Sequence, residues 1–309
     1  MSITMFVPDL RKALGLDHPL LMLDCLSLDS EAKTATGRKV ISVADPVFAG
    51  HFPGMPILPG VQQVAGMCQA AILLGQSLFP AKGRLALVGL ERVKFRKPVL
   101  PGHVLQTSVT FQQERQDGSL EFQATATHSD GQASAGTILL ATRDDEWFRP
   151  QYQADWQSPL AANFPAGKTD ALGLEKILPH RRPFLLADGA YGLADLEANC
   201  IYGYKNLSGA DPLLQASADS TFPGWLHPEV AAQLGCAYLL QHPENQGRTG
   251  IFLSIDKAVF HYPAFAGEQL QLKITCIYNG RAGSAEAIIY SGNRLVSEIS
   301  IKFLFVDKI

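Results

Sequence analysis

The chain has 309 residues, of which 47% are apolar, and its formal net charge at pH 7 is −3. This length predicts two domains with a sizeable core, and the charge argues against a nucleic-acid-binding surface. The first residues show no signal-like segment, and no run reaches the roughly 18 apolar residues of a membrane span. Five scattered cysteines without C-x-x-C spacing indicate buried free thiols in a reducing compartment. We therefore expect a cytoplasmic protein that acts on a small or protein-tethered molecule.

The expected elements occur twice in the same order along the chain. A strand over 36–43 precedes a helix over 60–78, and a strand over 197–204 precedes a helix over 227–241. Four strands follow each helix, at 85–95, 104–113, 120–128 and 133–141, and then at 250–260, 269–278, 284–290 and 295–306. One long buried helix followed by antiparallel strands predicts an α+β fold, with a curved sheet wrapped on the helix.

An internal duplication accounts for this order. Pro19 and Pro183 each open a short apolar run, and they lie 164 residues apart. The same offset, or one residue more, relates Pro59 to Pro223, Gln69 to Gln233 and Phe95 to Phe260. Several such residues in one register indicate a repeat. We predict repeat 1 at residues 1–142, a linker at 143–170 and repeat 2 at 171–309. The linker's tryptophans, Trp147 and Trp156, suggest that it packs against the repeats.

The most informative stretch runs from His51 to Gly60 and reads H-F-P-G-M-P-I-L-P-G. A histidine lies in a Pro- and Gly-rich loop, and Pro59-Gly60 then opens a helix that is apolar on nearly every face. The start of such a buried helix presents unpaired N–H groups and a positive field. The stretch therefore predicts a titratable imidazole beside a helix N-terminus, an arrangement that suits acid–base catalysis.

This stretch resembles the signature of the FabA/FabZ-type 3-hydroxyacyl-[acyl-carrier-protein] dehydratases, a hotdog-fold family. The family pattern H-F-P-G-x-P-x-x-P-G-V is complete here, and in the family it is followed on the helix by E-x-x-A-Q. Ala65 stands where the carboxylate of that second motif is expected. The resemblance implies a double hotdog, in which two repeats form a pseudo-dimer within one chain.

The second repeat carries the missing motif as Glu229–Gln233, but it has no histidine at the place of His51. Depending on the alignment, that place falls on Gln215, Ser217 or Thr221. Dehydratases of this family share each site between two subunits. The resemblance therefore implies one composite site made by His51 and Glu229, and a second site that lacks both groups.

Dehydration of a 3-hydroxyacyl thioester removes a weakly acidic C2 proton and expels the 3-hydroxyl. Neutral His51 can take the proton, and Glu229 can protonate the hydroxyl or hold a water that does so. Burial raises the pKa of such a carboxyl and a helix N-terminus lowers it, so the sequence leaves the protonation state of Glu229 open. The resemblance implies that the Gly60 N–H stabilises the thioester oxygen, with Gly224 as the alternative donor, and that the Ile57 carbonyl orients the imidazole.

The remaining polar residues near these motifs have structural interpretations. Gln69 and Gln233 are expected to be buried amides that satisfy backbone groups. His180, in L-P-H-R-R-P-F, is expected to be structural. His227 is expected to be a neighbour of Glu229 without a role, with an auxiliary polar group as the alternative. The other histidines show no metal-ligand spacing, so the sequence predicts no metal and no cofactor.

The resemblance thus predicts a (3R)-3-hydroxyacyl thioester dehydratase that forms a trans-2-enoyl product in fatty-acid, polyene or polyketide-type synthesis. The expected partner is an acyl-carrier protein with a phosphopantetheine-linked chain, and CoA is the alternative carrier. Lys94, Arg96 and Lys97 are either a solvated strand end or a docking patch for that acidic carrier. A hotdog thioesterase and a non-catalytic acyl-binding or scaffolding partner are the alternative functions. Exposed sheet edges also allow further homo- or hetero-oligomers.

Overall fold

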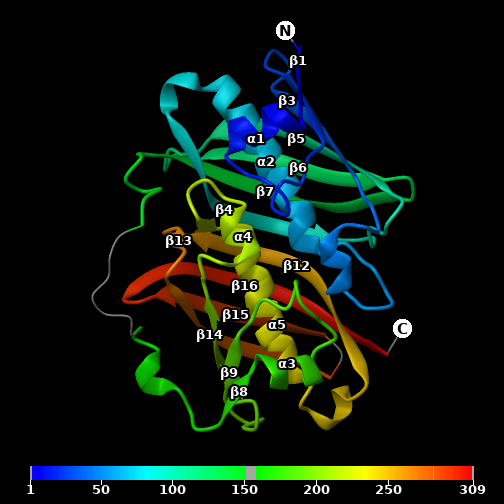
Figure 1. The fold of residues 1–309 in the computed structure, drawn as a ribbon, viewed down its shortest axis with the longest axis vertical. Coiled ribbons are helices and arrows are strands. Elements are labelled where there is room, and N and C mark those ends of the chain that lie inside the picture. The colour runs from blue at the N-terminus through cyan, green and yellow to red at the C-terminus, as the bar shows by residue number, and fades with distance from the viewer. Residues whose placement is uncertain (1, 151–157, 281, 308–309) are drawn as a thin grey trace.

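The computed structural model describes residues 2–150, 158–280 and 282–307, which build one large sheet with helices packed against it (Figure 1). Within these residues fourteen strands pair in the order β1-β2-β3-β5-β6-β7-β4-β12-β16-β15-β14-β10-β9-β8. In the first half the strands are β1 (Ser2–Phe6), β2 (Cys25–Asp29), β3 (Thr34–Val40), β4 (Arg84–Phe95), β5 (Val104–Glu114), β6 (Leu120–His128) and β7 (Gly131–Arg143).

The second half supplies the other seven strands of the large sheet. They are β8 (Lys168–Asp170), β9 (Gly189–Tyr191), β10 (Cys200–Asn206), β12 (Arg248–Phe260), β14 (Gln269–Tyr278), β15 (Ala282–Ser291) and β16 (Arg294–Asp307). Two very short strands, β11 (Thr221–Phe222) and β13 (Ala264–Phe265), pair separately.

The helices fall into two long ones and several short ones. The long helices are α2 (Gly60–Leu78) and α5 (His227–Leu239). The short α-helices are α1 (Val7–Leu14), α3 (Ala171–Ile177) and α4 (Pro212–Gln215). Single 3-10 turns are η1 (Pro46–Ala49), η2 (Pro80–Lys82), η3 (Ala161–Asn163), η4 (Gly224–Leu226) and η5 (Pro243–Asn245). None of the described helices has both the length and the apolar content needed to cross a bilayer.

Strand order repeats about the centre of the sheet, where β4 and β12 pair antiparallel with Leu90 opposite Ala258. Outward from this seam, the order β4-β7-β6-β5-β3 is matched by β12-β16-β15-β14-β10. Helix α2 packs against the first set and α5 against the second. The structure is therefore the α+β arrangement predicted from the sequence, with a buried helix on each half of an antiparallel sheet.

The two long helices are buried on nearly all sides because apolar and small residues dominate their sequences. Of the nineteen residues of α2, fourteen are buried, including Ala65. Gly75 lets the helix approach the sheet closely, since a Cβ there would lie 2.6 Å from Cδ1 of Leu85. This packing fixes the start of each helix relative to the sheet, and the His51 loop and Glu229 lie at those starts.

The sequence predicted the long elements better than the edges of the sheet. Helix α2 and strands β6 and β14 have the predicted bounds, whereas the short outer strands at the two ends of the sheet, β1, β2, β8 and β9, were not predicted. Strands of three to five residues are too short to show a clear alternation of apolar and polar side chains. Trp147, in the expected linker, is half-buried against Phe148, and Trp156 lies outside the described residues.

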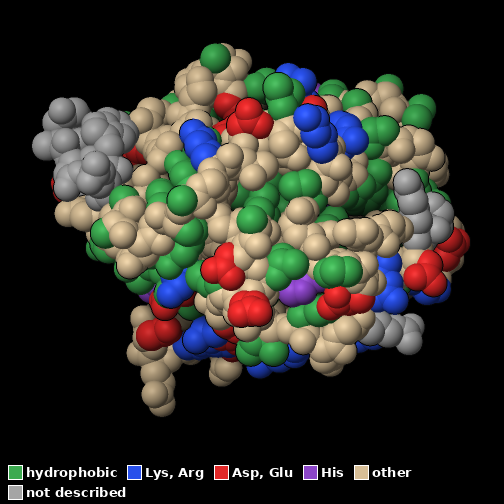
Figure 2. Space-filling view, turned by 90° about the horizontal axis from the view of Figure 1, so that it is seen from below, with side chains coloured by type: hydrophobic (Ala, Val, Ile, Leu, Met, Phe, Trp, Pro, Cys, Tyr) green, Lys and Arg blue, Asp and Glu red, His purple; other side chains and the backbone are tan. Residues whose placement is uncertain are grey.

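The molecular surface carries both signs of charge. On the face seen in Figure 2, Lys and Arg side chains lie among Asp and Glu side chains. This mixture agrees with the small net charge of −3 for the whole chain.

Candidate active site

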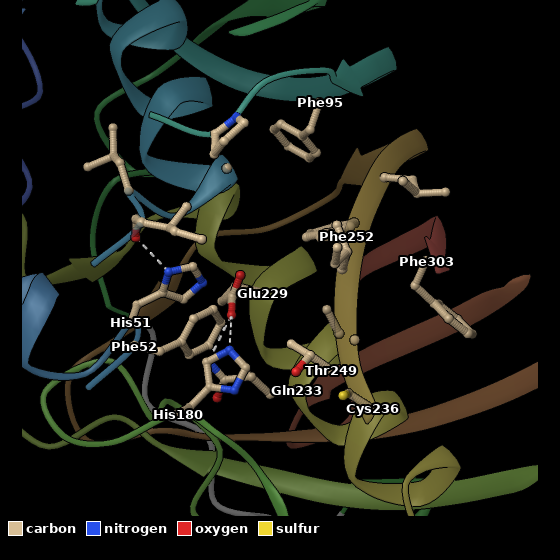
Figure 3. A pocket seen from close by; sticks show the side chains of 18 of the residues that line it. His51, Phe52, Phe95, His180, Glu229, Gln233, Cys236, Thr249, Phe252 and Phe303 are labelled. Atoms are coloured by element: carbon tan, nitrogen blue, oxygen red, sulfur yellow. Dashed lines mark hydrogen bonds and ion pairs between the residues drawn. The ribbon is translucent and has the colours of Figure 1, made fainter. Parts of the chain in front are cut away.

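A cavity of about 360 Å³ lies between the two halves of the chain. The first half contributes the His51 loop, the start of α2 and the end of β4, and the second half contributes α5, β12 and β16. Figure 3 shows His51, His180 and Glu229 pointing toward one another at one end of it. The cavity thus collects polar groups from segments that are far apart in the sequence.

His51 is held in one orientation by the backbone of its own loop. Its Nδ1 lies 2.7 Å from the carbonyl oxygen of Ile57, and the Ile57 N–H donates to the His51 carbonyl at 3.1 Å. Because a carbonyl only accepts, Nδ1 carries the proton and Nε2 keeps its lone pair. Burial lowers the pKa of His51 to about 4, although the charge of Glu229 opposes this shift. The imidazole is therefore neutral at pH 7 and can act as a base.

Glu229 lies in the first turn of α5 and is only 4% exposed. Its Oε1 accepts a hydrogen bond of 2.9 Å from Nε2 of Gln233, one helical turn later, and lies 3.5 Å from Nε2 of His180. Burial raises the pKa of the Glu229 carboxyl, but His180, His51 and Gln233 together lower it below its ordinary value. The group is therefore a carboxylate at neutral pH, and among the described residues its Oε2 accepts no hydrogen bond.

The structure brings His51 and Glu229 together and adds His180, which the sequence analysis expected to be structural. One ring nitrogen of each histidine and one carboxylate oxygen all lie within 4.8 Å of one another. The rings of His51 and His180 have centroids 5.4 Å apart. His180 is buried, and it comes from the L-P-H-R-R-P-F segment of the second half.

Main-chain contacts dock the His180 segment onto the His51 loop. The Arg181 N–H donates to the Gly50 carbonyl at 2.9 Å. A Cβ on Gly50 would lie 2.2 Å from the Arg181 carbonyl oxygen, so only glycine permits this approach. The ring of Phe52 also meets the ring of His180 edge-on at 4.9 Å. Docking of this segment therefore places an imidazole beside Glu229.

The other half of the pseudo-dimer repeats this docking without the two imidazoles and the carboxylate. The Asp17 N–H donates to the Ala216 carbonyl at 2.8 Å, as Arg181 does to Gly50. These matched bonds align His51 with Ser217 and His180 with Leu16. Ser217 is therefore the counterpart of His51 among the three positions that the sequence allowed. The Oγ of Ser217 instead contacts Oγ1 of Thr221 at 3.0 Å.

The same alignment shows how His180 could have been found from the sequence. The 164-residue offset relates Leu16 to His180 just as it relates Ala65 to Glu229. Three polar groups are thus present together at one site and replaced together at its counterpart. Comparing each histidine with its counterpart in the other repeat would therefore have grouped His180 with Glu229, which the L-P-H-R-R-P-F motif alone did not do.

Gly60 lines the cavity at the first position of α2. The first N–H groups of a helix have no intrahelical acceptor and can bind a negative oxygen. The ring of Phe95 covers Gly60 so closely that a Cβ would lie 2.7 Å from it. Gly224 lies in a similar way against Phe260, but it is not among the residues that line the cavity. The geometry favours Gly60 over Gly224 as the donor.

Beyond the polar end, the cavity is walled mainly by apolar side chains. Phe95, Phe252 and Phe303 line it together with Cys236 and Thr249 (Figure 3). Such walls suit a hydrocarbon chain, because a hydrocarbon loses no hydrogen bonds on entering them. The cavity therefore combines an acid–base end with an apolar channel.

The two helix glutamines satisfy buried backbone groups, as predicted. Gln69 accepts from the Met22 N–H at 2.8 Å and donates to the Leu20 carbonyl at 2.7 Å. Gln233 makes the matching bonds to Leu186 and Phe184, at 2.8 and 2.9 Å. Only Gln233 also reaches a carboxylate, so it has a part in the site that Gln69 lacks.

His227 does not line the cavity, although it lies two residues before Glu229. It is buried, its Nδ1 lies 3.0 Å from Oγ of Ser297, and burial lowers its pKa to about 4. Gln63, its counterpart in the first half, accepts a matching hydrogen bond from Ser134 at 2.7 Å. The equivalent bonds give both positions the same packing role.

Two groups of described residues have the atoms and spacing to hold a metal ion, and the sequence analysis indicated neither. They are His51 with His180 and Glu229, and His103 with His128 and Asp130. The residues of the first group come from distant segments, so no local ligand spacing exists to reveal them.

Comparison with known proteins gives matches in sequence and in structure. The family model described as ApeI dehydratase matches residues 27–137. A FabZ 3-hydroxyacyl-[acyl-carrier-protein] dehydratase of Symbiobacterium thermophilum is 35% identical over 135 residues, which are 43% of this chain and 94% of that relative. The FabZ protein of Erythrobacter litoralis is 40% identical over 112 residues, covering 35% of this chain and 74% of the relative.

Solved structures resemble nearly the whole chain in fold. The dehydratase domain of the CurJ module of the curacin polyketide synthase superposes with a TM-score of 0.63 at 15% identity, covering 93% of this chain and 97% of that domain. The PpsC dehydratase domain of Mycobacterium tuberculosis gives 0.60 at 14% identity, covering 94% and 99%. The sequence relatives match one repeat and the folds match both. The chain therefore belongs to the FabZ-type family of 3-hydroxyacyl-[acyl-carrier-protein] dehydratases, in a form that joins two hotdog repeats in one polypeptide.

Proposed function

We propose that the protein is a lyase that dehydrates (3R)-3-hydroxyacyl thioesters to trans-2-enoyl thioesters in fatty-acid or polyketide-type synthesis. One observation carries the proposal: a neutral imidazole and a carboxylate from opposite repeats face one cavity whose other walls are apolar. Membership of the dehydratase family supports the same reaction. His51, Glu229 and Gly60 are the proposed reacting and stabilising groups, and Ile57 orients the imidazole.

The proposed reaction begins at His51. Its Nε2 takes the C2 proton of the bound thioester, and the negative charge that develops on the thioester oxygen is met by the Gly60 N–H. Glu229 holds the 3-hydroxyl through Oε2. Since Glu229 is ionised at rest, it must receive a proton before it can donate one. Protonated His51, with a ring nitrogen within 4.8 Å of the carboxylate, supplies that proton through one bridging water, so the hydroxyl leaves as water and both side chains return to their starting states.

The proposed carrier is an acyl-carrier protein, with CoA as the alternative. Arg96 and Lys97 are exposed and also line the cavity, and Lys94 lies exposed nearby on β4. Exposed cations beside the cavity would attract the phosphate of a phosphopantetheine arm, and they favour an acidic partner. We propose the cytoplasm as the compartment, because the five free cysteines suit a reducing environment.

The deciding experiment measures dehydration of a short 3-hydroxyacyl-carrier substrate by the wild type, His51→Ala and Glu229→Gln. Each variant is expected to lose on the order of 1000-fold in kcat, because each removes a proton-transferring group. His261→Ala, which removes an imidazole outside the cavity, is the matched control and is expected to keep full activity. Full activity in Glu229→Gln would contradict a composite site.

Two further readouts separate the alternative functions. Release of free thiol from an acyl thioester, without enoyl product, would indicate a thioesterase. Acyl binding without turnover in the wild type would indicate a non-catalytic binding or scaffolding role.

A further inference from the structure

We propose that His51, His180 and Glu229 also bind one divalent transition-metal ion of the Zn²⁺ class, and that the ion competes with the acyl substrate for the site. Metal binding stands apart from the proposed function, and only the competition rests on it.

The ligand set is that of known zinc sites with an open position, namely two imidazoles and one carboxylate. Tetrahedral Zn²⁺ with ligands at about 2.0–2.1 Å requires ligand atoms about 3.3 Å apart. Nε2 of His180 and Oε1 of Glu229 are already 3.5 Å apart, and all three ligand atoms lie within 4.8 Å of one another. Side-chain rotations that move the ligand atoms by no more than about 1.5 Å therefore bring all three to the spacing that Zn²⁺ requires.

Outer hydrogen bonds already orient two of the three ligands. Metal-binding histidines usually donate their second ring N–H to a carbonyl or carboxylate, which fixes the tautomer. His51 does this through Nδ1 to the Ile57 carbonyl at 2.7 Å, which leaves Nε2 free toward the cavity. Gln233 holds the carboxylate of Glu229 at 2.9 Å in the same manner. The supporting contacts of a metal site are thus present before any ion binds.

Charge balance favours a cation here. Glu229 is buried, and among the described residues His180 is the only His, Lys or Arg whose side-chain nitrogen lies within 4.0 Å of its carboxylate. Buried charges are normally paired or bound to a metal. Two imidazoles among three ligands select Zn²⁺ or Co²⁺ over Mg²⁺ and Ca²⁺, which prefer oxygen. The open side of the ion would face the cavity, where the substrate must also bind.

The second group of candidate ligands has poorer geometry. The rings of His103 and His128 are stacked, with centroids 4.2 Å apart and planes 19° apart, so their in-plane lone pairs run nearly parallel and do not converge on one ion. The Asp130 side chain is 63% exposed. His103→Asn therefore serves as the matched control.

The test titrates chelator-treated protein with Co²⁺ and follows the visible absorption of cobalt in a four- or five-coordinate site. The wild type and His103→Asn are expected to bind one ion per chain with the same spectrum. His180→Asn is expected to lose at least 10- to 100-fold in affinity, because a lost ligand costs no less than a lost outer contact. Glu229→Gln, which keeps the side-chain shape, is a second variant with the same expectation if His180→Asn does not fold.

Each outcome decides the proposal. Absence of a wild-type cobalt spectrum, or equal affinity in the wild type and both site variants, would overturn it. Zn²⁺ is expected to raise the apparent KM for the acyl substrate and leave kcat unchanged, with reversal by EDTA, whereas inhibition that lowers kcat alone would overturn the competition. Dehydration without metal binding would leave the proposed function standing, and metal binding without dehydration would leave only the metal site.

Discussion

Gln69 and Gln233 occupy equivalent places in the two repeats, and the difference between them isolates one contact of the site. Both amides satisfy a buried N–H and a buried carbonyl, but Gln233 also donates to Glu229. Internal duplication thus supplies a natural control: a residue with the same packing and no role in the site.

We expect Gln69→Ala and Gln233→Ala to lower the free energy of unfolding by similar amounts, about 2–4 kcal/mol, because each leaves two buried backbone groups unpaired. Only Gln233→Ala should lower kcat, on the order of 10- to 100-fold, since Glu229 then loses a contact that fixes its orientation. Urea unfolding and dehydration assays on both variants provide the comparison. Equal kcat in the two variants would contradict a positioning role for Gln233.

At the scale of secondary structure, an ion-pair network ties three strands of the first repeat together. Arg115, just after β5, makes two hydrogen bonds of 2.9 Å to the carboxylate of Glu91 on β4 and one of 2.8 Å to Glu121 on β6. The three side chains are 25%, 21% and 13% exposed. The hydrogen bonds from Arg115 lower the pKa of both carboxyls below the ordinary value of a glutamate.

A carboxyl with a lowered pKa in the folded state contributes stability above its unfolded pKa and loses it as the pH falls. We expect Arg115→Met to reduce the free energy of unfolding by about 1–2 kcal/mol at pH 7, since the network is partly exposed. The difference from the wild type should shrink below pH 4.5, where the wild type loses the same contribution. Urea unfolding at pH 7 and at pH 3.5 measures the difference in the free energy of unfolding at each pH. Arg115→Lys is the variant that keeps the positive charge but loses the planar guanidinium, which bonds both oxygens of Glu91. A difference independent of pH would contradict this account.

At the scale of the whole molecule, the β4–β12 seam joins two repeats that each hold part of the site. His51 belongs to one repeat, and His180 and Glu229 belong to the other. We propose that the repeats are residues 1–142 and 171–309, with 143–170 as the linker between them. Separating the repeats would expose β4 and β12 as open edges and divide the site.

We expect fragments 1–142 and 171–309 to show no dehydration when each is produced alone. Co-expression should restore part of the activity, since the seam and the cavity can then form between chains. Dehydration assays on the purified fragments and on the co-purified pair test this, with the intact chain as reference. Activity in either fragment alone would show that the site is not shared.

The sequence by itself was enough to predict the duplication, the two buried helices and the meeting of His51 with Glu229. These features depend on patterns within one segment or on one fixed offset between segments, and a linear sequence preserves both. The prediction of two helices with four strands each followed from the same local periodicity.

The tertiary structure alone decided which groups share the cavity. His180 reaches Glu229 because the Arg181 N–H docks on Gly50, a contact that joins residues more than a hundred positions apart. The same folding aligned His51 with Ser217 and gave the channel its apolar walls. It also placed Gly60, and not Gly224, against the cavity as the candidate N–H donor to the thioester oxygen. The pKa values of His51 and Glu229 also depend on burial and on neighbours from both repeats. Distances and burial arise only when remote segments pack, so residue spacing along the chain could not supply them.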